Sequence, residues 1–422
     1  MAEIFPYKGI FYNSEKVIDF AKVICPPYDV ISQEEQEEFY KVHPCNIIRI
    51  DYGKIFPSDS QRDNRYTRAK TFFHRWIKEG VLIQDKFLSF YLLAQEFKYR
   101  ENKFVRWGII CRFRLSKGKG IFFHEKTSSL PKRDRFRLIK AVKTNINPIF
   151  ALFEDKQRFM EKLGKEFSSS RPFIQFKFRG VKHSLWRIDD AKSIREIKEY
   201  FRRKNVFIAD GHHRYEVALL YQQYCRKRNP YHTGKEDYNF VMMYLTPLEN
   251  EALKILSTHR VIKEAPPDLF NRLGVYFDIE PKKKADLFSL LDSPKKNNYI
   301  FGMYTGGKVF YLLRLKKWLK PEMIVREDRS SAWKRLDVSL FHALIIEKIF
   351  GIKNSDFKNI FYTQDIKEAI SKVRSKEFKV AFFLRPTSSQ EVKEVALARE
   401  RMPHKSTYFY PKLPSGLIIS PV

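Results

Sequence analysis

Two kinds of apolar pattern alternate along the chain. Strand-like runs, in which apolar residues predominate as in buried strands, occupy Phe87–Leu93, Val105–Phe113, Ser184–Ile188, Lys204–Ile208, Tyr238–Leu245, Tyr299–Tyr304, Val309–Leu315 and Lys379–Leu384. Apolar positions with helical spacing occupy Pro131–Val142, Asp190–Phe201, Tyr215–Lys227 and Leu340–Phe350. Strands that alternate with helices in this way predict an α/β or α+β fold.

One segment interrupts this alternation. Glu264–Asp268 contains two adjacent prolines, which is a signal for a linker or a domain edge. We therefore expect an N-terminal and central α/β region over residues 1–265 and a second α/β region over residues 266–422. The last segment, Pro403–Pro421, is rich in proline and turn residues but also in aromatic residues, so we expect it to dock on the body of the protein.

The composition limits the class of protein. The chain has 422 residues, of which 43% are apolar, and this is enough to bury a large core. No apolar run is long enough to span a bilayer, and the N-terminus lacks the pattern of a signal peptide. The cysteines are sparse and form no C-x-x-C pair, so neither a disulfide framework nor a zinc site is expected. These features favour a cytoplasmic protein without a membrane partner.

The charge has two interpretations. Lys and Arg number 80 against 49 Asp and Glu, which gives a net charge of +31. Such an excess is typical of proteins that bind nucleic acid or other polyanions. The basic residues are spread along the whole length, however, and Lys, Phe, Ile, Tyr and Asn are all frequent, as in a protein encoded by AT-rich DNA. Both interpretations stay open, and the even spread favours composition.

The strongest candidate site is the junction between the run Lys204–Ile208 and the following helix. Gly211 there allows a sharp turn and a close approach of a ligand, and a helix start attracts anions. Arg214 can bind a phosphate with two parallel hydrogen bonds, and His212 and His213 can assist. Asp210 can hold a metal ion or accept a hydroxyl proton. The structural alternative is that Asp210 only caps the helix.

Weaker candidates lie elsewhere. His124 and Glu125 follow the apolar run 120–123 and can relay protons or bind a metal, although an ordinary loop is the preferred interpretation of this segment alone and H-E-x-x-H is absent. Arg260 can add a phosphate contact. In the tail, Lys405, Ser406 and Thr407 offer an ammonium and two hydroxyl groups between aromatic residues.

Several common nucleotide-binding and catalytic motifs are absent. The sequence contains no Walker A loop, no G-x-G-x-x-G after a strand and no G-x-S-x-G. P-loop, Rossmann and α/β-hydrolase folds are therefore disfavoured, and neither NAD nor flavin is expected as a cofactor.

Five motifs together resemble a known family. Ile24–Ile31, His124–Thr127, Ala209–Tyr215, Thr258–Arg260 and Met402–Lys412 occur in the order found in the family called domain of unknown function 1015. The resemblance covers nearly the whole chain, and Cys25 stands where a small residue such as Ala is expected. The family name itself implies no activity.

The Asp-Gly-His-His-Arg junction is also similar to the phosphate-binding turn of the ParB and sulfiredoxin superfamily. That superfamily includes CTP-binding segregation clamps, ATP-using sulfiredoxin and free-serine kinases. The resemblance implies that Gly211 and Arg214 bind phosphate, while His212 and His213 replace the cysteine that sulfiredoxin chemistry needs. It implies a nucleotide such as ATP, ADP or CTP, with Mg²⁺.

Two functions from different classes follow. The first is a kinase or phosphatase that acts on a small hydroxyl compound or its phosphomonoester, such as serine or phosphoserine, with catalysis by positioning and charge neutralisation. The second is a nucleotide-binding, DNA-associated protein, which the charge of +31 favours. The helix from Tyr215 leads to Pro230 and then a strand, so no helix-turn-helix follows the turn. The enzyme is therefore preferred, a scaffold without catalytic activity is a third alternative, and the oligomeric state stays open.

Overall fold

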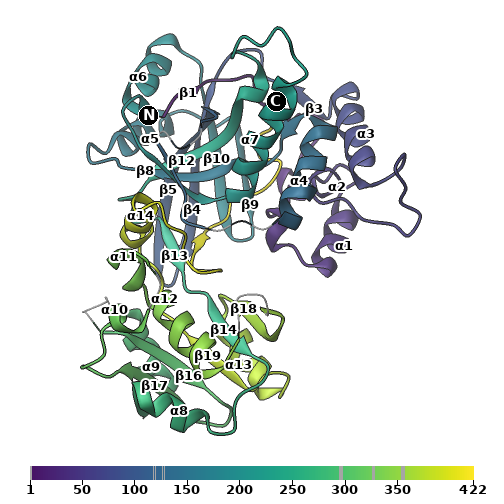
Figure 1. The fold of residues 1–422 in the computed structure, drawn as a ribbon. Coiled ribbons are helices and arrows are strands. Elements are labelled where there is room, and N and C mark those ends of the chain that lie inside the picture. The colour runs from purple at the N-terminus through teal and green to yellow at the C-terminus, as the bar shows by residue number, and fades with distance from the viewer. Residues whose placement is uncertain are drawn as a thin grey trace. The chain divides into compact units, whose positions relative to one another are not determined.

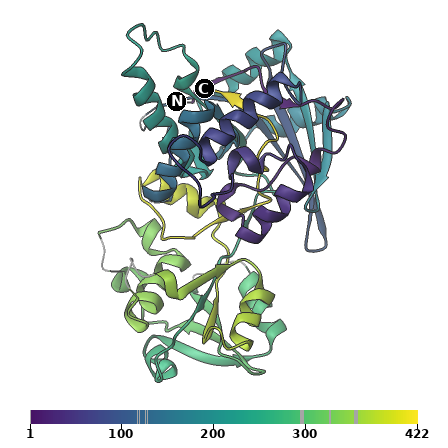
Figure 2. The same ribbon diagram turned by 90° about the vertical axis from the view of Figure 1, so that its right-hand side faces the viewer.

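Contacts divide the protein into two compact units (Figures 1 and 2). The computed structural model describes residues 2–116, 118, 120–125, 127, 129–293, 298–325, 328–352 and 357–422. The first unit consists of Met1–Phe123, Thr127–Leu253 and Pro411–Val422, and the second of His124–Lys126 and Lys254–Tyr410. Both units mix strands and helices, so the expected α/β class is confirmed.

A large mixed sheet forms the centre of the first unit. Within the described residues it has nine strands in the order β6-β11-β8-β12-β5-β4-β10-β9, with β1 beside β5. Most neighbours are antiparallel, but β12 runs parallel to β8, and β11 runs parallel to β6. The bounds are β1 Ile4–Phe5, β4 Phe90–Tyr99, β5 Asn102–Arg114, β6 Ile121–Phe122, β8 Ile149–Phe153, β9 Ile174–Phe178, β10 Val181–Ile188, β11 Val206–Asp210 and β12 Phe240–Pro247.

Helices cover this sheet because each has one apolar face. In α6, for example, Ile197 and Phe201 are fully buried in the sheet core, while the charged positions face outward. Helix α3 packs on both α2 and α4, and α4 packs on α7. Figures 1 and 2 show α2 and α3 side by side in purple. The bounds are α1 Gln33–Val42, α2 Ile48–Asp51, α3 Arg65–Lys78, α4 Ser129–Val142, α5 Phe159–Ser168, α6 Ala191–Phe201 and α7 His212–Arg226.

The last residues of the chain return to the first unit. Strand β21 (Ser420–Pro421) pairs with β7 (Thr144–Asn145), and Leu417, Ile418 and Ile419 are fully buried. A second short pair joins β2 (Ile10–Tyr12) to β3 (Leu82–Gln84). The tail is therefore docked, as its aromatic and apolar content predicts.

The second unit has its own antiparallel sheet and core. Its strand order is β15-β17-β16-β19-β14-β18. The strands are β14 His259–Ile262, β15 Phe277–Lys282, β16 Ile300–Tyr304, β17 Phe310–Leu315, β18 Ile360–Thr363 and β19 Val380–Phe383, with β13 Lys254–Leu256 paired to β20 Tyr408–Tyr410. The helices are α8 Leu269–Tyr276, α9 Lys284–Asp292, α10 Pro321–Ile324, α11 Ser331–Lys334, α12 Asp337–Phe341, α13 Ile366–Arg374 and α14 Ser389–Leu397.

Most of the predicted elements are present, although β4 begins at Phe90 and not at Phe87, since Phe87 and Leu88 are exposed, and two further differences concern helix winding and the units. The helix predicted at Leu340–Phe350 is an α-helix only in α12, and His342–Ile349 continue as a π-helix in which the amide of Phe350 bonds the carbonyl of Ile345. The α-helical spacing of the sequence does not predict this winding, because π-helices with i→i+5 hydrogen bonds are rare. The second difference concerns the units: residues 254–265 belong to the second unit, because β14 pairs with β18 and β19.

No helix of the described residues is both long and apolar enough to cross a membrane.

Candidate functional site

The predicted turn between β11 and α7 is present. Strand β11 is buried from Val206 to Ala209 and ends at Asp210, and α7 begins at His212. Gly211 lies between them with a φ of 91°, a left-handed conformation that side chains disfavour. Gly211 is also the N-cap, and no side chain caps the first turn. Since the first amides of a helix lack partners within the helix, this end of α7 can receive an anion.

Asp210 is held between two cations. Its Oδ2 accepts a hydrogen bond from Nη2 of Arg214 at 2.8 Å, and its Oδ1 accepts one from Nζ of Lys412 at 2.6 Å. The three side chains are 14–17% exposed. Burial alone would raise the pKa of Asp210, but Lys412, Arg214 and then His212 hold this pKa well below its ordinary value. Asp210 is therefore an ionised partner of two cations, not a helix cap.

Arg214 is engaged with protein oxygens. Its Nη1 donates to the backbone carbonyl and the side-chain oxygen of Asn147 and, at 2.6 Å, to the carbonyl of Pro148. Its guanidinium also lies over Gly211, where an added Cβ would come within 2.8 Å of Nη2. A phosphate that binds Arg214 must therefore compete with these partners, so Arg214 has a structural role as well.

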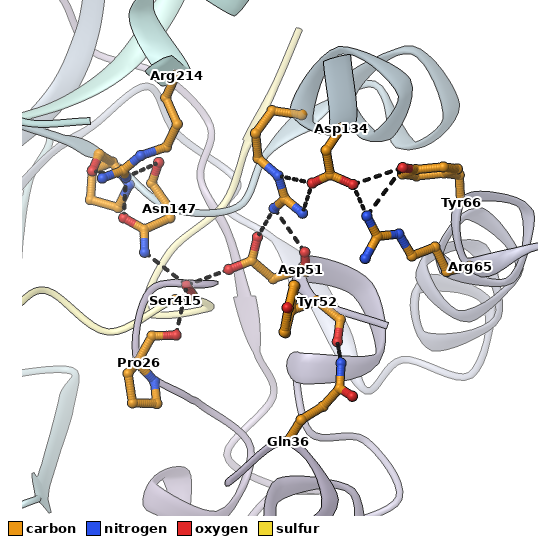
Figure 3. A network of polar contacts seen from close by, with 12 residues as sticks. Pro26, Gln36, Asp51, Tyr52, Arg65, Tyr66, Asp134, Asn147, Arg214 and Ser415 are labelled. Atoms are coloured by element: carbon orange, nitrogen blue, oxygen red, sulfur yellow. Dashed lines mark hydrogen bonds and ion pairs between the residues drawn. The ribbon is translucent and has the colours of Figure 1, made fainter. Parts of the chain in front are cut away.

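A polar network continues from Arg214 into the helical layer (Figure 3). Asn147 donates to Oγ of Ser415 at 2.7 Å, and Ser415 donates to Asp51 at 2.6 Å. Asp51 in turn accepts from Arg135 at 2.9 Å. Arg135 also donates to Asp134, and Figure 3 shows the network continuing from Asp134 to Arg65 and Tyr66. The network joins helices α2, α3 and α4 to the turn.

The sequence interpretation missed Lys412 and Ser415. Lys412 belongs to the tail motif Met402–Lys412, but only Lys405, Ser406 and Thr407 of that motif were singled out. The signal that indicates Lys412 is its place in the same motif, while nothing in the spacing indicates Ser415. Both come from the tail segment that returns to the first unit.

The two histidines of the turn differ in exposure. His212 is only 2% exposed, and its ring lies 6.3 Å from that of Phe123. His213 is half-buried in the first turn of α7. His213 is thus the more accessible of the two.

The remaining candidates lie in the second unit. Nε2 of His124 lies 3.1 Å from the hydroxyl of Thr407, and the backbones of Glu125 and Met402 form an isolated parallel β-bridge. Arg260 is 5% exposed and donates to the carbonyl of Lys405 at 3.0 Å, and burial lowers its pKa to about 10. The hydroxyl of Ser406 donates to the carbonyl of Pro403. Lys126 of the His124–Thr127 motif lies outside the described residues.

The predicted site residues therefore form two sets. The turn set is Asp210, Gly211, His212, His213 and Arg214, now with Lys412. The other set is His124, Glu125, Arg260, Lys405, Ser406 and Thr407, and several of its members contact one another within the second unit.

The described residues do not contain a ready-made metal centre. No three His, Cys, Asp or Glu side chains in this part of the chain gather so that they could hold a metal ion. Asp210 offers a single carboxylate, and both of its oxygens already accept from cations.

The chain belongs to the family DUF1015, described as a protein of unknown function, which matches residues 4–339. The family resemblance seen in the motifs is thereby confirmed, whereas the likeness of the turn to the ParB and sulfiredoxin superfamily stays a prediction. No curated protein matches the chain.

Solved structures share its architecture only loosely. A conserved hypothetical protein from Pyrococcus furiosus is similar with a TM-score of 0.34 and 12% identity, over 73% of this chain and 93% of that one. A variant of free serine kinase in complex with ADP has a TM-score of 0.35 and 11% identity, over 72% and 87%. SbnI from Staphylococcus aureus, with a C-terminal truncation, has a TM-score of 0.35 and 12% identity, over 72% and 85%. Likenesses at this level carry no argument about function.

Proposed function

We propose that this member of the DUF1015 family is a phosphate-handling enzyme, a kinase or phosphatase of a small hydroxyl compound or its phosphomonoester. The observation that carries the proposal is the turn at Gly211, where a helix start without a side-chain cap lies beside Arg214 and Lys412. Serine and phosphoserine are the first substrates to test, and ATP, ADP or CTP the nucleotides.

The charges of the turn support an anionic ligand. Arg214 and Lys412 contribute two positive charges and Asp210 one negative charge, which leaves one positive charge at the start of α7. The helix start adds a partial positive charge of its own. A phosphate group fits this combination, and phosphoryl transfer needs little more from a protein than positioning and charge neutralisation.

Asp210 suits an orienting role better than that of a general base. A carboxylate whose pKa is held well below its ordinary value takes up a proton poorly at neutral pH. It holds Lys412 and Arg214 in place instead. Mg²⁺ would fit only with the phosphates of a bound nucleotide as its main ligands, because Asp210 alone offers one carboxylate. His213, the more accessible histidine, is the better candidate to assist the reaction.

The experiment is a ligand screen on the full chain. Thermal unfolding is measured with ATP, ADP, CTP, serine and phosphoserine, each with and without Mg²⁺, because a ligand that binds the native state raises the melting temperature. Hits are titrated by calorimetry against Lys412→Met and the control Lys227→Met, which removes the same charge at the far end of α7.

We expect Lys412→Met to weaken binding of the phosphorylated ligand about tenfold, equivalent to about 1.4 kcal/mol, while Lys227→Met matches the unaltered protein. Equal affinity of all three proteins, or the absence of any stabilising ligand, contradicts the proposal.

A second candidate function is supported by the net charge of +31. It is a nucleotide-binding, DNA-associated protein, as the likeness of the turn to the ParB superfamily implies. DNA binding and its dependence on salt separate this function from the enzyme.

A further inference from the structure

The first unit contains a cavity away from the turn at Gly211, and the two share no residue. It is an open groove of about 970 Å³, lined by β1, the loop 86–88 and residues along the length of α6. Its volume is close to the upper end of the range of small-molecule pockets, which is about 300–1,000 Å³. It is large enough for a ligand of some length.

The lining of the groove is largely apolar. Ile4 and Ile194 contribute side chains that also pack toward the core of the unit, and half-buried Phe5 lies beside Ile4 on β1. Phe87 and Leu88 lie beside them and are 63% and 55% exposed, although both are large hydrophobic residues. Adjacent exposed apolar side chains in a groove are typical of a binding surface.

Positive charge surrounds this apolar lining. Lys8, Lys86, Arg195, Lys198 and Arg202 line the groove, against the carboxylates of Glu3, Asp189 and Glu199. Two of these carboxylates are already neutralised, since Glu3 pairs with Arg114 at 2.8 Å and Glu199 with Arg202 at 3.5 Å. The remaining charge of the rim is therefore positive.

The start of α6 does not add a phosphate site. Asp190 caps this helix and accepts from the amide of Ser193 at 2.8 Å, so the first turn is closed by a carboxylate. The cations of the rim are mostly lysines, which act as point charges rather than as bidentate phosphate clamps. A single anionic group such as a carboxylate complements point charges of this kind.

We propose that this groove binds an alkyl carboxylate, with the chain on Phe5, Phe87, Leu88 and Ile194 and the carboxylate near Lys86 or Lys198. Nζ of Lys198 lies 5.1 Å from the centre of the Phe5 ring, so a cation stands directly at the apolar surface. The proposal is independent of the phosphate chemistry assigned to the turn.

The test is calorimetric titration of the full chain with decanoate below its micellar concentration. Phe87→Asp places a carboxylate on the apolar surface, and Lys198→Glu reverses a charge at its rim. Both side chains are exposed, so both variants are expected to fold. Trp318→Asp is the matched control, because Trp318 is an aromatic residue of the second unit with 65% exposure.

We expect saturable binding of decanoate that Phe87→Asp and Lys198→Glu each weaken about tenfold or more and that Trp318→Asp leaves unchanged. Decyltrimethylammonium, which has the same chain and the opposite charge, should not compete. The proposal is overturned if decanoate does not bind, if the groove variants bind it as the control does, or if the cationic probe competes equally.

Discussion

At the residue level, Asp210 shows what sequence spacing can and cannot predict. Asp210 and Arg214 are four residues apart, so their proximity follows from the strand-to-helix junction. Lys412 lies 202 residues further along the chain, and no local pattern indicates that it binds the same carboxylate. The sequence therefore predicted the turn but not the full set of charges around it.

Replacing Asp210 with Asn tests the charge pairing. Asparagine keeps the shape of the side chain but removes the negative charge that pairs with two partly buried cations. We therefore expect the free energy of unfolding to fall by about 2 kcal/mol, which is less than the loss on breaking a fully buried ion pair. A simple helix cap predicts almost no loss, because Asn caps as well as Asp. Urea unfolding at pH 7 measures the difference, and an unchanged midpoint contradicts the pairing.

The same variant makes a prediction about pH. The pKa of Asp210 is depressed in the folded state, so its contribution to stability is present above the ordinary carboxyl value of 3.8 and is lost as pH falls further. The stability difference between the unaltered protein and Asp210→Asn should therefore be constant from pH 7 to pH 5 and shrink toward pH 3. A difference that grows on acidification has the wrong sign.

His259 gives a pH dependence in the second unit. It is 4% exposed, and burial followed by the neighbouring Arg260 lowers its pKa from 6.5 to about 4. The unfolded chain binds a proton here between these values and the folded chain does not, so stability is lost as pH falls from 6.5 to 4. The maximum loss is about 3 kcal/mol.

The variant His259→Gln should have a shallower decline in unfolding free energy between pH 6.5 and pH 4.5 than the unaltered protein. Exposed His74 supplies the control, His74→Gln, which should keep the full decline. If both variants show the same decline, burial of the neutral His259 imidazole does not cause the loss of stability at low pH.

At the level of elements, the local pattern predicted most strands and helices, because the buried face of each element determines where apolar residues occur along it. Strand β5 and helix α6 lie where the apolar runs and spacing indicate, whereas β4 begins at Phe90 and continues to Tyr99, beyond the predicted run Phe87–Leu93. The tail segment is not predicted in this way, since its strands β20 and β21 are short. Strand β20 belongs to the second unit and β21 to the first. Which partner a short strand finds depends on the assembled sheet and not on its own sequence.

The strand-to-helix turn can be tested through its glycine. In Gly211→Ala the new Cβ meets the guanidinium of Arg214 and the residue also keeps a positive φ. Gly180→Ala is the control, because Gly180 has a φ of 78° but open space around its Cβ. We expect about 1 kcal/mol of destabilisation for the control from backbone strain alone and clearly more for Gly211→Ala. If urea unfolding shows the same loss of unfolding free energy for both variants, the guanidinium of Arg214 moves aside without a cost in stability.

At the level of the whole molecule, the sequence alone did not predict how the units are composed. The proline pair at Pro266 and Pro267 is a good signal of a turn, but contacts assign residues from Lys254 onward to the second unit and those from Pro411 onward to the first. The chain thus crosses between the units more than once. A single linear boundary does not describe such a path, because pairing with β18 and β19 and burial of the tail outweigh local turn signals.

The net charge of +31 leads to the last prediction, which concerns DNA. Many cations of the described residues are already paired with carboxylates or lie over aromatic rings, as Arg228 does over Tyr224 at 3.8 Å. If the charge reflects composition, a labelled duplex should bind only weakly at physiological salt, with a dissociation constant of about 1 µM or higher. The logarithm of the affinity should fall linearly with the logarithm of the salt concentration, whatever the sequence of the duplex. Fluorescence anisotropy between 50 and 200 mM salt, with and without CTP or ATP, measures this. Tight and sequence-selective binding that a nucleotide switches would instead favour the DNA-associated function over the enzyme.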